Sequence, residues 1–168
     1  MKRRPGLVLP ALALLLSGCG LHPLYSGGGS GAVATTLTRI EVGPIEGKSG
    51  WLMTNALHDR LSAGGATPLY RLEVKLDDQI IGLGVRSDDS VSRERRTLRA
   101  RYQLIDLANG TVLLDATAGS DAGIDVVNSE YATIAAENTA LERLSDIVAD
   151  QIVSRVALYA QRTAAPKQ

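Results

Sequence analysis

The chain of 168 residues contains a single cysteine, Cys19. A lone cysteine cannot form an intramolecular disulfide, and it is too little for a cysteine-based metal centre. The sequence also lacks the G-x-S-x-G pattern of serine hydrolases, and its two histidines, His22 and His58, do not have a metal-ligand spacing. These absences predict that the protein is not an enzyme, has no metal site and is stabilised by packing alone.

The N-terminal apolar run is too short to span a bilayer. It extends from Leu7 to Leu16, and a transmembrane helix needs about 20 apolar residues. The basic residues 2–4 precede it, which is the order of an export signal. Residues 16–19, Leu-Ser-Gly-Cys, then resemble the bacterial lipobox. We therefore expect residues 1–18 to be a lipoprotein signal peptide and Cys19 to be lipidated; the alternative is an ordinary signal peptide with a chance cysteine.

The residues around Cys19 also predict where the protein resides. Stable anchoring takes at least two acyl chains, so a triacylated Cys19 would stay on its membrane. Gly20 follows the cysteine, where an aspartate would favour retention in the inner membrane of enteric bacteria. We expect an outer-membrane location on the periplasmic side, with the lipid on Cys19 in place of any cofactor. Three of the 18 basic residues lie in the signal, so the mature chain has a net charge of −3 and no bulk attraction for nucleic acid.

The remaining sequence predicts a tether followed by one domain. Residues 19–35 include a glycine-rich segment, which is typical of a flexible tether. Residues 36–162 are long enough for a single α/β domain, and residues 163–168 are expected to be a disordered tail.

Hydrophobic periodicity within the domain predicts four strands and two helices. Apolar and polar residues alternate over the four expected strands, 39–42, 70–77, 98–104 and 112–118. Helical spacing predicts helices over residues 50–63 and 129–162. Residues 86–96 are expected to form a loop, and Asn109-Gly110 predicts a hairpin turn. The order β-α-β-β-β-α predicts an α/β two-layer sandwich, in which two helices cover one face of a four-stranded mixed sheet.

Motif and element order together resemble a known family. The segment Cys19–Tyr25, CGLHPLY, is similar to the "CGFxPLY"-type start of the LptE family of LPS-assembly lipoproteins, particularly its alphaproteobacterial members. The resemblance implies an outer-membrane lipoprotein that plugs the β-barrel protein LptD and takes part in lipopolysaccharide transport. It supplies no catalytic residue. The alternatives are an auxiliary lipoprotein of an ABC-type envelope lipid transporter and a lipid-anchored hydrolase.

The densest cluster of charge is the run RERRTLRAR, residues 93–101. If its strand begins early enough, four arginines share one face: Arg93, Arg95, Arg99 and Arg101. Guanidinium groups bind phosphate, which lipopolysaccharide carries, so these residues are candidate lipopolysaccharide contacts. The structural alternative is a solvated face on which Glu73, Glu94 and Asp115 pair with the arginines.

Other candidate sites have weaker signals. Two acidic pairs, Asp77-Asp78 and Asp88-Asp89, could attract calcium but lack the spacing of an EF-hand. Gly82 and Gly84 lack the third glycine of a dinucleotide loop and predict a twisted or bulged strand end. We expect Trp51 to be partly buried and His58 to lie on a helix surface.

Overall fold

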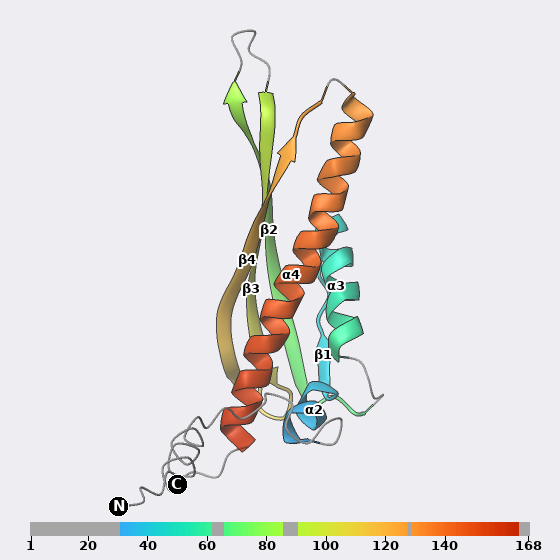
Figure 1. The fold of residues 1–168 in the computed structure, drawn as a ribbon. Helices are drawn as coiled ribbons and strands as arrows, with labels where there is room; N and C mark the ends of the chain where they lie inside the picture. The colour runs from blue at the N-terminus through green and yellow to red at the C-terminus, as the bar shows by residue number, and fades with distance from the viewer. Residues whose placement is uncertain (1–30, 62–65, 86–90, 128, 165–168) are drawn as a thin grey trace, which may run out of the picture.

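A computed structural model describes residues 31–61, 66–85, 91–127 and 129–164. Within them the chain forms a mixed sheet with helices on one face, as the sequence predicts (Figure 1). The elements, labelled as in Figure 1, are α2 (Ala32–Leu37), β1 (Ile40–Val42), α3 (Gly47–Leu61), β2 (Tyr70–Val85), β3 (Val91–Asp106), β4 (Val112–Asp125) and α4 (Glu130–Ala164). The strand order is β1-β2-β3-β4; β1 pairs parallel with β2, and the other neighbours are antiparallel.

The core lies between the sheet and the helices. Alternate residues of β2 and β3 face the helices, and Leu72, Leu98 and Leu104 are completely buried there. The helices contribute apolar residues at spacings of three and four, which form one stripe on each helix. In this core they are Met53, Leu57 and Leu61 from α3 and Leu141, Leu144, Val148, Ile152 and Val156 from α4. Figure 1 shows α4 running along the whole sheet, whereas α3 lies beside only part of its length.

The three long strands extend well beyond the predicted ones. β2 and β3 have 16 residues each and β4 has 14. The predicted loop over 86–96 is wrong from residue 91 onward, because β3 begins at Val91. Gly82 and Gly84 lie in the last four residues of β2, so they are close to a strand end as expected, but no register shift between β2 and β3 accompanies them and the bulge is absent. Residues 80–85 put apolar side chains on both faces of β2, and residues 92–97 put polar side chains on both faces of β3. Hydrophobic alternation therefore stops although the backbone ladder continues.

Helix α2 is an addition to the predicted fold. It falls mostly in residues 19–35, where we expected a tether, and it packs against α4. Val33 and Leu37 are four residues apart, so both face the core and both are buried. The packed body therefore includes residues before 36. A short six-residue helix gives too weak a periodic signal to be predicted beside a glycine-rich segment.

The exposure of Trp51 and the bounds of α3 and α4 also differ from expectation. Trp51 on α3 has 65% of its surface exposed, so the predicted burial is wrong. It lies on the solvent side of α3, two residues from buried Met53 and therefore off the apolar stripe. α4 continues to Ala164, two residues beyond its predicted end, while α3 begins at Gly47 and ends at Leu61.

Candidate ligand-binding face

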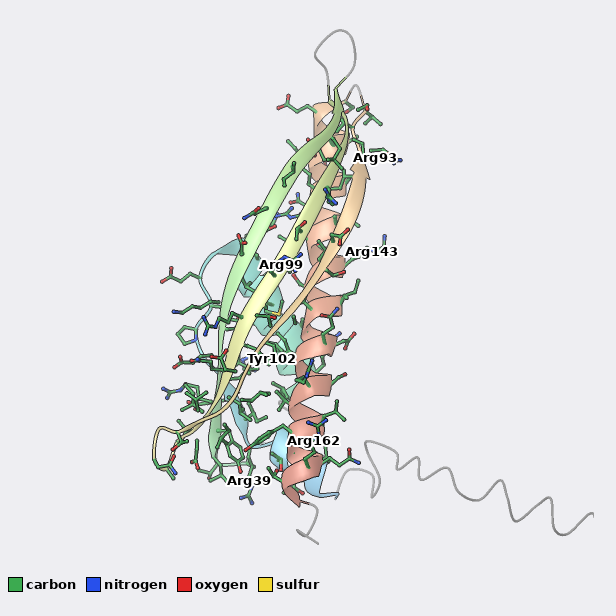
Figure 2. All side chains as sticks on the ribbon, turned by 90° about the vertical axis from the view of Figure 1, so that its left-hand side faces the viewer. Arg39, Arg93, Arg99, Tyr102, Arg143 and Arg162 are labelled. Carbon is green, nitrogen blue, oxygen red and sulfur yellow. The ribbon has the colours of Figure 1, made fainter. Side chains whose placement is uncertain are left out.

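The four predicted arginines lie on one face of β3, away from the helices. β3 begins early enough for Arg93, Arg95, Arg99 and Arg101 to share this face, and all four are exposed. At about 3.4 Å per residue, the row is roughly 27 Å long. Figure 2 shows Arg93 near the tip, defined here as the end where β2 ends and β3 begins, and Arg99 farther down the sheet. We call this surface of β2, β3 and β4 the outer face.

The two outermost arginines of the row are paired with aspartates of β4. Arg93 Nε lies 3.1 Å from Asp125 Oδ1, and Arg101 Nη2 lies 3.0 Å from Asp115 Oδ2. The Gln103 side chain donates a further hydrogen bond of 2.8 Å to Asp115. The hydrogen bond from Arg101, followed by that from Gln103, lowers the pKa of Asp115, and the pKa of Arg101 is raised in turn by its bond to Asp115. The pairing predicted for Asp115 is therefore confirmed.

The pairing predicted for the other two acids is wrong within the described residues. Glu73 has no basic group within ion-pair distance there. Glu94 shares the parity of Arg96 and buried Leu98, so it faces the helices rather than the arginine row. Its Oε2 atom is buried and has no hydrogen-bond partner among the described residues.

Arg95 and Arg99, in the middle of the row, have no ion pair within the part of the chain that the structure describes. Arg99 lies close over Gly119, where an added methyl group would be 3.2 Å from its Cγ. A hollow of about 540 Å³ adjoins Arg99 and is also lined by Lys75 and Arg101. Arg99 thus lies beside two further cationic side chains and one acid, Asp77, which is in register with it and also lines the hollow. The excess of positive charge suits an anion.

Apolar side chains adjoin the row toward the tip. Ile81 is in register with Arg95, and Leu83 is in register with Arg93. Ile81 is 49% exposed although it is a large aliphatic residue. The outer face therefore joins cationic and aliphatic groups, a combination that suits a phosphorylated amphiphile better than a small polar anion.

One arginine of the same run has a different role, which sequence reasoning missed. Arg96 points toward the helices, where its Nε and Nη2 donate to the two carboxylate oxygens of Asp78 at 2.8 and 2.6 Å. Its Nη1 donates to the carbonyl oxygen of Glu137 on α4 at 2.9 Å. Its even residue number could have indicated this role, because it places Arg96 on the face of β3 opposite to the four odd-numbered arginines. It joins β2, β3 and the first half of α4.

The remaining predicted residues do not form a site in the described part. Asp78 is occupied by Arg96, and Asp77 accepts hydrogen bonds from Gln79. His58 is exposed on α3, as predicted. Cys19, His22, Asp88 and Asp89 lie outside the described residues. Among those that are described, no three His, Cys, Asp or Glu side chains gather as metal ligands do, and no helix combines the length and apolar character needed to cross a membrane.

Comparison with known proteins gives a family match over most of the body. The model of the family described as "LptE: Lipopolysaccharide-assembly" matches residues 37–156, which run from the end of α2 into the last third of α4. No curated protein matches the chain by sequence.

Solved structures of lipoproteins share the fold. A lipoprotein from Caulobacter crescentus CB15 is similar with a TM-score of 0.68 and 26% sequence identity, over 80% of this chain and 99% of that chain. A minor lipoprotein from Acinetobacter baumannii has a TM-score of 0.55 and 17% identity, over 71% and 91% of the two chains. Rare lipoprotein B from Shewanella oneidensis has a TM-score of 0.54 and 10% identity, over 74% and 100%.

Proposed function

The chain belongs to the LptE lipopolysaccharide-assembly family, and from this premise we propose that it plugs and helps to assemble an LptD-type β-barrel of the outer membrane. In this proposal it is a non-enzymatic lipoprotein, anchored through Cys19 on the periplasmic side, and lipopolysaccharide binds to it directly. The observation that carries the proposal is the family match over residues 37–156. The same match favours this role over that of an auxiliary lipoprotein of an ABC transporter.

The dimensions of the body support a role inside a barrel. At 1.5 Å per residue, the 35 residues of α4 extend about 52 Å, and the 16 residues of β2 have a similar length. A bilayer with its headgroups is about 40–45 Å thick. A rod of these proportions is long enough to follow a barrel lumen from one membrane surface to the other.

The polarity of the sheet supports the same role. Exposed Arg71, Glu73 and Lys75 on β2 face the same way as the arginine row on β3 and Asp115 on β4. The lumen of a large outer-membrane barrel is polar and hydrated, so a polar face can lie against it without exposing apolar surface to water.

Direct contact with lipopolysaccharide is proposed for the middle of the outer face. Arg95 and Arg99 are free to bind phosphate, since no described carboxylate pairs with them. Ile81 and Leu83 beside the row offer aliphatic surface for acyl chains. Arg93 and Arg101 are weaker candidates for phosphate binding, because each would first have to break its ion pair with an aspartate.

Co-purification tests the partnership. The full-length chain should be isolated from envelopes in detergent with an LptD-type barrel in about equal amounts, and depletion of the chain should leave that barrel misassembled. Two variants would show which surface contacts the barrel: Arg99→Ala on the outer face and Trp51→Ala on the solvent side of α3. The amount of barrel retained by each would be compared. If neither the wild-type chain nor any variant retained a barrel, the proposed partnership would be refuted.

A further inference from the structure

β4 is an edge strand of the sheet. The sheet order is β1-β2-β3-β4, so β3 covers only one side of β4. The N–H of Gly119 points away from β3, since Gln151 Oε1 on α4 accepts it at 3.1 Å. Backbone groups of alternate residues in an antiparallel ladder share one direction. The N–H and C=O groups of Asp121, Gly123 and Asp125 are therefore directed outward as well, toward an additional strand.

A groove runs along this edge between β4 and α4. Its volume is about 640 Å³, and residues 121–125 of β4 form one wall. The α4 wall contains small and aliphatic side chains, namely Ala136, Ala140, Leu144 and Ile147, with Thr139 and Arg143. Ile147 is 44% exposed, which is unusual for an isoleucine on a helix that otherwise packs on the sheet. A strand added to β4 would place every second side chain in this groove.

The other face of such a strand would lie beside the acids of β4, with the arginine row of β3 one strand farther away. Asp121 and Asp125 are exposed on the outer face of β4. Asp125 has Arg93 as its partner, whereas Asp121 has no ion pair among the described residues. A lysine or arginine beside Asp121 would therefore be favoured. The edge thus selects a segment with apolar residues at alternate positions and a basic residue beside Asp121.

A second copy of the chain does not meet this requirement. Antiparallel pairing of two β4 edges would bring Asp115, Asp121 and Asp125 of one copy close to the same acids of the other. Like charges directly opposite one another destabilise a sheet. A partner with basic residues on one face gains attraction where a second copy meets repulsion.

We propose that the β4 edge binds an extended segment of a partner protein by strand addition, with apolar side chains in the β4–α4 groove and basic side chains beside Asp121. Strand addition obtains affinity from main-chain hydrogen bonds and specificity from the alternate side-chain positions. The inference goes beyond the proposed lipopolysaccharide contact and does not depend on it, because it uses the edge and the groove rather than the arginine row.

Hydrogen exchange of the full-length chain tests this proposal. Exchange would be measured by mass spectrometry in isolated outer membranes and again on the full-length chain produced without its envelope partners and purified in detergent. We expect peptides covering residues 121–125 to exchange at least about tenfold more slowly in membranes, because the outward amides are then bonded. Equal rates in the two states would overturn the proposal.

Two variants and a matched control give the test its specificity. Gly123→Pro removes one outward donor but no hydrogen bond to β3, and Asp121→Lys reverses the charge beside the edge. Both should abolish the protection in membranes. Gly82→Pro on β2 is the control. The Gly43 N–H donates to the Leu72 carbonyl oxygen, so the main-chain groups of even-numbered β2 residues point away from β3. The control therefore removes an outward donor at the opposite edge of the sheet. Protection that survived both β4 variants, or that Gly82→Pro removed, would overturn strand addition at β4.

The identity of the occupant is tested by a photocrosslinking residue at position 121 of the full-length chain. A covalent adduct with a protein segment that has a basic residue near the crosslink and apolar residues at alternate positions supports the proposal. An adduct with lipopolysaccharide alone, or with a second copy of the chain accompanied by concentration-dependent dimerisation, would overturn it.

Discussion

Arg96 on β3 binds both carboxylate oxygens of Asp78 on β2, at 2.8 and 2.6 Å, on the helix side of the sheet. The side chains are only 11% and 18% exposed. Arg96 also donates to the Glu137 carbonyl, so the ion pair links both strands to α4. A charged cluster thus joins the sheet to α4 on the tip side of buried Leu98. Such pairs are sensitive to the loss of one member, because the other charge remains buried.

Removal of Asp78 should destabilise the fold. Asp78→Ala leaves the Arg96 guanidinium largely buried without its counterion, and we expect the free energy of unfolding to fall by about 3 kcal/mol. The double variant Asp78→Leu with Arg96→Met should recover most of this loss, because it replaces the pair with apolar side chains. Urea denaturation of the three proteins provides the comparison. An Asp78→Ala protein as stable as the wild type would show that the pair does not hold the interface.

Charge reversal of the two free arginines should weaken lipopolysaccharide binding without loss of stability. Arg95→Glu with Arg99→Glu breaks no described ion pair, so we expect an unchanged melting temperature and at least about tenfold weaker binding. The salt dependence of the remaining binding should also be smaller. Arg155→Glu with Arg162→Glu on α4 makes the same change in net charge and serves as the control. Equal binding by both double variants would assign the arginine row to a solvated face.

The bond to Arg101 should be measurable as a shifted titration of Asp115. NMR titration should show a pKa below the ordinary value of about 3.9, and Arg101→Gln should raise it more than Gln103→Leu does. Because the folded pKa is the lower one, the stabilisation is present above the unfolded pKa and is lost as pH falls through the folded pKa. Arg71→Gln, whose partner is Glu41, should leave the Asp115 titration unchanged. An unaltered Asp115 pKa in Arg101→Gln would contradict the assigned pair.

Replacement of the lone cysteine should prevent membrane anchoring. Cys19→Ser removes the thiol that accepts the lipid, so we expect an unprocessed precursor with no label from a clickable palmitate analogue. The wild-type chain should incorporate the label and fractionate with the outer membrane. Ser17→Ala is a control, because it keeps a small residue near the cleavage position. A wild-type chain without label would refute lipidation at Cys19.

The order of the elements and the buried stripes could be predicted because each depends on local periodicity. Leu72 and Val74, or Leu144 and Val148, are spaced so that one face of a strand or helix is apolar, and burial of those faces requires one layer of helices on one sheet. The common face of Arg93, Arg95, Arg99 and Arg101 followed from the same two-residue period.

Only the tertiary structure decided the length of the strands, the burial of Arg96 and the pairing of individual charges. Hydrophobic alternation ends near Asp77, but β2 continues to Val85, because main-chain hydrogen bonds form irrespective of side-chain type. Parity distinguishes Arg96 from Arg95, yet its partners Asp78 and Glu137 are distant in sequence. The sequence by itself determined which residues share a face, since that follows from backbone geometry; tertiary packing determined which of them meet across strands and that β4 lies at an edge of the sheet.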